Sequence, residues 1–215
     1  MRVDGQERLQ SGSRLFGQAL RRIQTGDTSS DCEALLREAM PILRSAMNHL
    51  EDTPLFEKAH QRLDQVGRLA RENFRSGCAL TYDKGSYHQQ CPVSLAHNRV
   101  GLSIEYILRA SECSICHQDP DDCTHITGRT YDGEECIQII TDAELTGTAL
   151  VGRPAFADAR IESVGMPTDE LRETLGPKFS PGDTTVYCDR CLSNCDGVTR
   201  PFEESGHGRA AGVEL

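Results

Sequence analysis

The strongest chemical signal in the sequence is a group of four potential metal ligands within thirteen residues. Cys113 and Cys116 form a Cys-x-x-Cys pair, and Cys123 and His125 follow after a short loop. Zinc takes four such thiolate and imidazole ligands in a tetrahedron. Residues two apart on an extended chain share a face, so Cys123 and His125 can point at the same ion. We therefore predict a structural zinc site here. Two nearby residues are reserve ligands: His117 and Cys136.

A second group of thiols lies near the end of the chain. Cys188, Cys191 and Cys195 fall within eight residues, so a fourth ligand must come from elsewhere in the fold. We favour Cys78 or Cys91, because both lie in the part of the chain that we expect to be β-rich. The other candidates for this position are Cys136, His207 and Cys32.

The two Cys-x-x-Cys pairs allow a different assignment. Cys113, Cys116, Cys188 and Cys191 could bind one ion as a split zinc ribbon. That assignment would leave three candidate ligands without a role: Cys123, His125 and Cys195. We rank two zinc sites ahead of one, since two sites use more of the available ligands. Either way one or two structural zinc ions are expected. Thiolate-rich shells are closed, whereas hydrolytic zinc keeps an open position for water, and no His-Glu-x-x-His motif is present.

Composition limits the classes of protein that the chain can belong to. It has 215 residues, 10 of them cysteines, and a net charge of −10. The first ten residues lack the apolar core of a secretory signal, so we expect a cytoplasmic protein whose cysteines bind metal rather than form disulfides. No apolar run approaches the roughly 20 residues of a membrane span. The negative charge disfavours nucleic acid as a partner, although zinc knuckles do occur in nucleic-acid readers.

The first part of the chain, residues 1–76, has the apolar spacing of amphipathic helices. One helix is expected over 8–23 and a second over about 35–50, which Pro41 should kink or split. Thr53 and Pro54 offer a cap and a first-turn proline for a third helix. This segment carries 12 basic and 11 acidic residues, whereas the remainder carries 11 basic and 22 acidic. The difference in charge supports a separate helical unit.

From residue 77 the pattern changes to that of strands. Apolar residues alternate with polar ones from Val100 to Leu108, and Asp132-Gly133 is typical of a hairpin turn. Further strands are expected over 148–151 and 160–164, followed by a short helix from Thr168 that Gly176 ends. We predict an α+β fold with a helical unit (1–76), a zinc-stabilised β-rich domain (77–202) and a flexible tail (203–215).

Two short segments resemble the phage prohead (capsid maturation) proteases. Residues 101–106 are similar to the strand that carries the nucleophile in that family, and residues 142–155 are similar to the segment after it; residues 159–161 also fit. The resemblance covers about residues 91–164, with a zinc-bearing insertion between the two segments. It implies Ser103 as the nucleophile, activated by a histidine.

The sequence departs from that family at the positions that matter for activity. The nearest histidines are His88 and His97, and neither lies in the family's histidine motif. Glu105 also replaces the small residue that usually follows the serine by two positions. We therefore expect a non-enzymatic zinc-binding protein that acts as a protein-interaction or assembly module. The alternatives are a prohead-type serine protease using Ser103 and a zinc-dependent nucleic-acid-binding protein.

Overall fold

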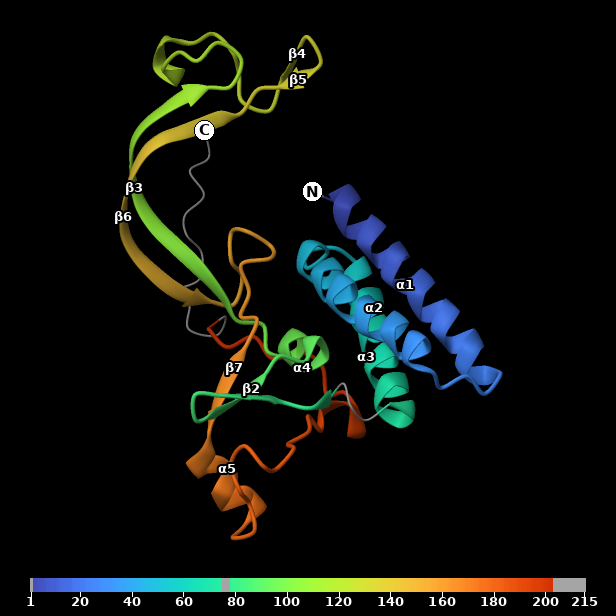
Figure 1. Cartoon of the computed structure of the whole chain (residues 1–215). Helices are drawn as coiled ribbons and strands as arrows, with labels where there is room; N and C mark the ends of the chain where they lie inside the picture. Colours follow the sequence, from blue (N-terminus) through green and yellow to red (C-terminus); the bar gives the residue numbers. More distant parts are fainter. Residues whose placement is uncertain (1, 75–77, 203–215) are drawn as a thin grey trace. The chain divides into compact units, whose positions relative to one another are not determined.

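The computed structural model describes residues 2–74 and 78–202, and it has the predicted α+β fold (Figure 1). The chain forms two compact units. One contains the chain up to Gly101 and from Val151 onward, and the other contains Leu102–Leu150. The tail predicted for 203–215 lies outside the described residues. Among the described helices, none combines the length and the apolar character that crossing a membrane requires.

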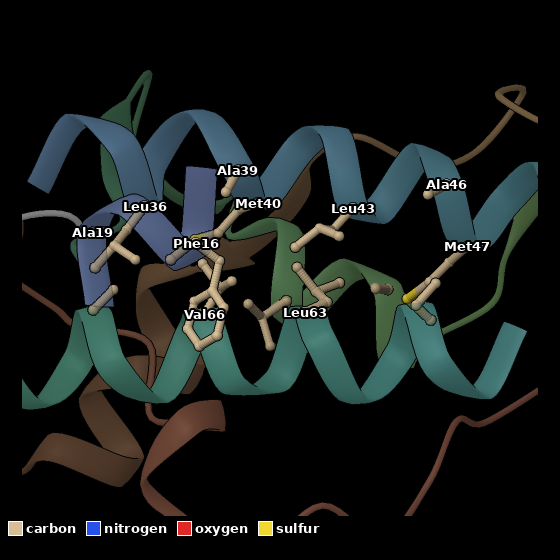
Figure 2. Close-up of a cluster of buried hydrophobic side chains, with 14 of the residues drawn as sticks. Phe16, Ala19, Leu36, Ala39, Met40, Leu43, Ala46, Met47, Leu63 and Val66 are labelled. Carbon is tan, nitrogen blue, oxygen red and sulfur yellow. The ribbon is translucent and has the colours of Figure 1, made fainter. Parts of the chain in front are cut away.

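Three helices form the main core of the first unit: α1 (Arg2–Gln24), α2 (Ser30–His49) and α3 (Leu55–Asn73). Each turns one apolar stripe inward, as the helical spacing predicts. Figure 2 shows these side chains interleaved between α2 and α3. The buried set includes Phe16, Ala19, Leu36, Ala39, Met40, Leu43, Ala46, Met47, Leu63 and Val66.

Local sequence fixes the helix ends. The Ser29 hydroxyl accepts the Cys32 N–H at 3.4 Å and caps α2. The α2 helix is not split at Pro41, which lies inside it at an exposed position. The missing N–H and the proline ring therefore face solvent, and the buried face of α2 continues past them. The Thr53 hydroxyl accepts the Leu55 N–H at 3.2 Å, where α3 begins.

A small antiparallel sheet completes the first unit. Its strands are β1 (Thr81–Asp83), β2 (Ser86–Gln89) and β7 (Val164–Pro167), in the order β1-β2-β7. The helices α4 (Pro92–His97) and α5 (Thr168–Leu175) flank these strands in sequence, and a short 3-10 turn, η3 (Arg190–Leu192), follows. The predicted strand over 160–164 is not formed as such: β7 starts only at Val164, and Arg160 makes an isolated bridge to Gly101.

The three N-terminal helices pack against parts of the chain that follow residue 77. Val93 and Ala96 of α4 are buried in the helical core, and Cys191 of η3 packs against it. The helical segment 1–76 therefore shares one unit with α4, the small sheet and the C-terminal region. The boundary that the structure shows lies instead at the two ends of the segment Leu102–Leu150.

The second unit is a long two-stranded ribbon with an irregular tip. Its strands are β3 (Gly101–Cys113) and β6 (Gln138–Val151), which pair with each other. The tip holds the 3-10 turn η2 (Pro120–Asp122) and a hairpin of β4 (Thr130–Tyr131) and β5 (Glu134–Glu135). Asp132 and Gly133 have φ values of 51° and 89°, which confirms the predicted Asp-Gly turn.

A buried ion cluster holds the segments of the first unit that adjoin this ribbon. The Glu51 carboxylate receives Arg99 Nε at 3.2 Å and Arg99 Nη2 at 2.9 Å, and it also pairs with Arg160. Arg99 Nη1 donates to Asn48 Oδ1 at 2.8 Å, and Arg160 Nη1 donates to the Gly152 carbonyl at 2.7 Å. The chain just before β3 and just after β6 is therefore tied to the end of α2.

Candidate metal centres

The predicted ligands Cys113, Cys116, Cys123 and His125 converge at the tip of the ribbon. Cys113 ends β3, and the chain then turns back on itself. The Cys113 N–H donates to the Gln118 carbonyl at 2.9 Å, and the His117 N–H donates to the Cys113 carbonyl at 2.8 Å. This closed turn places Cys116 over Cys113, and the turn η2 returns the chain to them at Cys123.

The four ligand atoms have the spacing of a tetrahedral metal site. The Cys116 and Cys123 Sγ atoms are 3.4 Å apart, and His125 Nδ1 lies 3.3 Å from Cys123 Sγ. His125 Nδ1 lies 3.7 Å from Cys113 Sγ. All four atoms lie within 4.8 Å of one another. Zinc–sulfur bonds of about 2.3 Å give a tetrahedron with edges of roughly 3.8 Å, so this group could hold a metal ion.

Backbone N–H groups stabilise negative charge on these sulfurs. The Ile115 N–H points at Cys113 Sγ at 3.4 Å, and the His125 N–H points at Cys123 Sγ at 3.2 Å. Burial raises the pKa of Cys113, but the N–H groups of Cys116 and Ile115 and the adjacent thiols outweigh it and lower this pKa to about 6. Burial and the neighbouring thiols raise the pKa of Cys123 to about 11. One thiolate forms readily, and the others need a cation beside them.

The hairpin next to the site supports its histidine. The Tyr131 ring packs edge-on against the His125 ring, with the centroids 4.5 Å apart. The Tyr131 hydroxyl accepts the Ile126 N–H at 2.9 Å. Sequence reasoning did not assign Tyr131 a role; its position beside the Asp-Gly turn was the available signal.

The two reserve ligands behave differently. Cys136 is buried, and its Sγ lies 3.7 Å from Cys113 Sγ, so it borders the site on one side. His117 points away: its Nδ1 lies 2.8 Å from Glu112 Oε1 on the exposed surface. We therefore treat Cys136 as a neighbour of the four ligands and leave His117 out of the site.

Three of the other predicted ligands share one core in the first unit. Cys78 and Cys188 are buried together, and Cys91 packs against them. The Cys188 N–H donates to the Cys78 carbonyl at 2.7 Å. A hydrogen bond from the Cys91 thiol is the largest of the effects that lower the pKa of Cys188 to about 6. Cys191 lies against Gly67 of α3, and burial raises its pKa to about 12.

Cys195 is placed with histidines instead of with Cys188 and Cys191. Its Sγ lies 3.1 Å from His97 Nε2 and 3.3 Å from His60 Nε2. Of the two Cys-x-x-Cys pairs, Cys113 and Cys116 belong to the ribbon unit and Cys188 and Cys191 to the other unit. Of the remaining candidates, Cys32 is buried in the helical core and His207 lies outside the described residues.

The serine and the histidines that the protease resemblance singles out belong to different units. Ser103 lies half-buried on β3 in the ribbon unit, and His88 lies half-buried on β2 in the other unit. Both ring nitrogens of His97 have partners within its own unit, since Nδ1 is 2.6 Å from the Val93 carbonyl and Nε2 faces Cys195. Activation of Ser103 by a histidine stays a prediction of the resemblance.

No family model, curated protein or solved structure matches this chain.

Proposed function

We propose that this is a non-enzymatic zinc protein whose ribbon, closed at its tip by one structural Zn²⁺, contacts a protein partner. The convergence of Cys113, Cys116, Cys123 and His125 carries the proposal. Three thiols and an imidazole favour zinc over magnesium or calcium, which require oxygen ligands. Four protein ligands fill the tetrahedron, so the ion has no position for a substrate or for reactive water.

Zinc has a clear physical task at this tip. The loop from residue 114 to residue 129 contains only the short turn η2. Of its two large apolar residues, Ile126 is exposed and Ile115 is only half-buried. Such a segment cannot bury enough apolar surface to offset its conformational entropy. Metal binding supplies that free energy, so folding of the tip depends on the ion.

The side chains of the ribbon favour a protein partner. A Cβ built on Gly147 would lie 3.2 Å from Glu105 Oε2, so these residues face each other across the strands. Glu105 therefore marks the polar face, and the even-numbered residues of β3 form the opposite face. A two-stranded ribbon has no second layer in which to bury apolar side chains. The exposed fractions on that face are 46% for Leu102, 53% for Ile104, 45% for Tyr106 and 46% for Leu108.

We define these four residues, Leu102, Ile104, Tyr106 and Leu108, as the apolar ribbon face. Contiguous exposed apolar groups of this kind mark interaction surfaces. Protein is favoured over nucleic acid as the partner because the net charge of the chain is −10. Protein is also favoured because the face presents aliphatic and aromatic groups rather than basic ones.

Affinity capture with the full chain tests the proposal. The zinc-loaded wild type should retain a specific protein that Cys123→Ser and Ile104→Lys both lose. Glu105→Gln, on the polar face of the same strand, is the matched control and should retain it. Capture of the same protein by metal-free Cys123→Ser would contradict the proposal, and so would retention by Ile104→Lys.

A further inference from the structure

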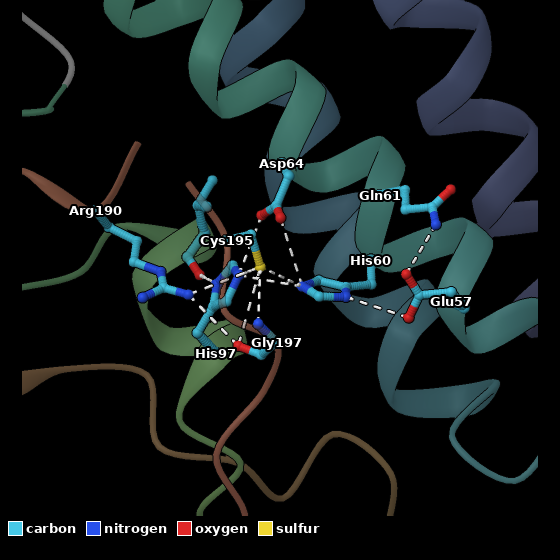
Figure 3. A network of polar contacts seen from close by, with 9 residues as sticks. Glu57, His60, Gln61, Asp64, His97, Arg190, Cys195 and Gly197 are labelled. Atoms are coloured by element: carbon cyan, nitrogen blue, oxygen red, sulfur yellow. Dashed lines mark hydrogen bonds and ion pairs between the residues drawn. The ribbon is translucent and has the colours of Figure 1, made fainter. Parts of the chain in front are cut away.

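A second group of potential ligands lies in the first unit, away from the ribbon. His60 and Asp64 are one turn apart on α3, His97 is the last residue of α4, and Cys195 follows η3. Figure 3 shows the four side chains directed at one point, between α3 and the C-terminal segment. The sequence reasoning named His97 and Cys195 for other roles and did not name His60 or Asp64.

The ligand atoms are as close as those at the ribbon tip. The Nε2 atoms of His60 and His97 are 3.1 Å apart. Cys195 Sγ lies 3.1 Å from His97 Nε2 and 3.3 Å from His60 Nε2. The Asp64 carboxylate lies 3.2 Å from His97 Nε2 and 3.5 Å from His60 Nε2. All four groups therefore surround a single point within 4.8 Å of one another.

The outer nitrogens of the two rings indicate which nitrogen is free to bind an ion. His97 Nδ1 is 2.6 Å from the Val93 carbonyl, which can only accept, so the proton is on Nδ1 and Nε2 carries the lone pair. His60 Nδ1 faces the Glu57 carboxylate at 3.5 Å, which likewise favours the proton on Nδ1 and the lone pair on Nε2. Outer-nitrogen partners of this kind, a carbonyl and a carboxylate, orient most metal-binding histidines.

This arrangement is unfavourable without a cation. Two imidazole lone pairs would face each other at 3.1 Å, next to a carboxylate and a thiol, with His60 and His97 both buried. A divalent ion at the centre converts each of these repulsions into a bond. A proton shared between the two rings is the competing explanation for their close approach. A bound ion and a shared proton can be told apart by measuring the metal content of the protein.

We propose that His60, Asp64, His97 and Cys195 form a second metal site, which binds a divalent transition metal and is best matched to Zn²⁺. Two imidazoles, one thiolate and one carboxylate are borderline ligands that suit zinc and exclude the oxygen-only ions. The site is independent of the proposed function, since none of its ligands belongs to the ribbon.

The ion would act as a clamp for the C-terminal segment. Cys195 is exposed, and the residues around it form no regular element beyond η3. The Gly197 N–H points at Cys195 Sγ at 3.3 Å, so the loop is already folded around the sulfur. Through Cys195 the metal would join this loop to α3 and to α4. Four protein ligands leave no open position, so the role is structural.

Zinc titration of the full chain tests the site. Cys195→Ala should bind one Zn²⁺ fewer per chain than the wild type, and Ser193→Ala, an exposed neighbour two residues away, should bind the wild-type number. His97→Ala should lose the same ion, with His88→Ala as its histidine control. Because His97 is buried and its variant can misfold, exposed Cys195 provides the decisive comparison.

A second variant distinguishes zinc binding at the ribbon tip from zinc binding at this site. Cys123→Ala should lose the tip ion only, and the double variant Cys123→Ala with Cys195→Ala should lose two. An unchanged zinc content in a folded Cys195→Ala variant would overturn the clamp and would indicate a proton shared between the histidines. That result would leave the tip site untouched, since Cys123→Ala reports on it alone.

Discussion

The sulfur atoms of Cys116 and Cys123 lie 3.4 Å apart at the tip of the ribbon, although a loop containing three aspartates separates them in sequence. Thiolates at this distance repel each other, and the loop adds further negative charge. A bound cation removes the repulsion, and for this reason the tip is the part of the molecule whose structure should depend most on metal.

Removal of zinc should therefore disorder the tip while the helices stay folded. With a chelator, we expect backbone hydrogen exchange to rise for the N–H groups of Ile115 and His125, which point at Sγ atoms. The amides of α2 lie in a separate unit and should keep their protection. Equal protection of the tip with and without the chelator would contradict a structural ion.

Cys136 should tune the site without being a ligand. Its Sγ is 3.7 Å from Cys113 Sγ, but it is not one of the four converging groups. Cys136→Ser should keep the tip zinc and weaken its affinity by about 10- to 100-fold, the usual effect of losing a neighbour of a metal ligand. Competition with a chromophoric chelator measures the zinc affinity of the variant and of the wild type. Loss of a whole zinc ion, as expected for Cys123→Ser, would instead make Cys136 a ligand.

The Glu51 cluster should contribute strongly to stability. The Glu51 side chain is only 7% exposed, and Glu51→Gln leaves Arg99 and Arg160 without their buried counter-charge. We expect a loss of about 3–5 kcal/mol in the free energy of unfolding. The control is the adjacent Asp52→Asn, because Asp52 pairs with Arg153 at the surface and should contribute below about 1 kcal/mol. If a denaturant titration showed similar losses of stability for Glu51→Gln and Asp52→Asn, the buried Glu51 cluster would not have the stabilising role that we assign to it.

The same cluster predicts a pH dependence. Burial raises the pKa of Glu51, but the hydrogen bond and charge of Arg99 and the charge of Arg160 outweigh it and lower this pKa below its usual 4.5. A lowered folded-state pKa stabilises the protein above the unfolded pKa, and this contribution is lost as pH falls through the folded value. The stability difference between wild type and Glu51→Gln should be largest above about pH 5 and shrink below it. A difference that is constant with pH would exclude ionised Glu51 as its source.

Two glycines on α1 provide a matched test of packing. A Cβ at Gly12 would lie 2.6 Å from Cγ of the buried residue Leu43, whereas a Cβ at Gly17 would meet only Arg21 Nη1, at 3.7 Å. Gly17→Ala should stabilise the protein by about 0.5–1 kcal/mol through helix propensity. Gly12→Ala should destabilise it by about 1–3 kcal/mol, since overpacking outweighs that gain. Thermal unfolding midpoints that shift in the same direction would contradict the packing of α1 on α2.

Local patterns in the sequence predicted the features that depend on neighbouring residues. The tip ligands lie within thirteen residues, and the Asp-Gly turn is set by its own backbone preferences. The second cluster could not be found this way, because 135 positions separate His60 from Cys195. Only the packing of the C-terminal segment around η3 against α3 and α4 brings them together. His60 and Asp64, one helical turn apart, were the local sign of that site.

Most of the long strand β6 could not be predicted from its own sequence. Only its end, 148–151, and residues 135–140, as the second arm of the Asp-Gly hairpin, are expected from the sequence as strands. The intervening residues 141–147 include Asp142, Glu144 and Gly147, which are residue types depleted in strands. Pairing with β3 imposes the extended conformation there, so its source is the partner strand and not its own composition.

Elemental mass spectrometry of zinc in Cys123→Ser and His117→Gln, each purified without added metal, tests the central claim most directly. Both residues lie in the same tip, but only Cys123 is one of the converging ligands. We predict that Cys123→Ser contains one zinc ion per chain fewer than the wild type and that His117→Gln contains the wild-type amount. Equal zinc in both variants and the wild type would show that the tip holds no zinc and would contradict the proposed function.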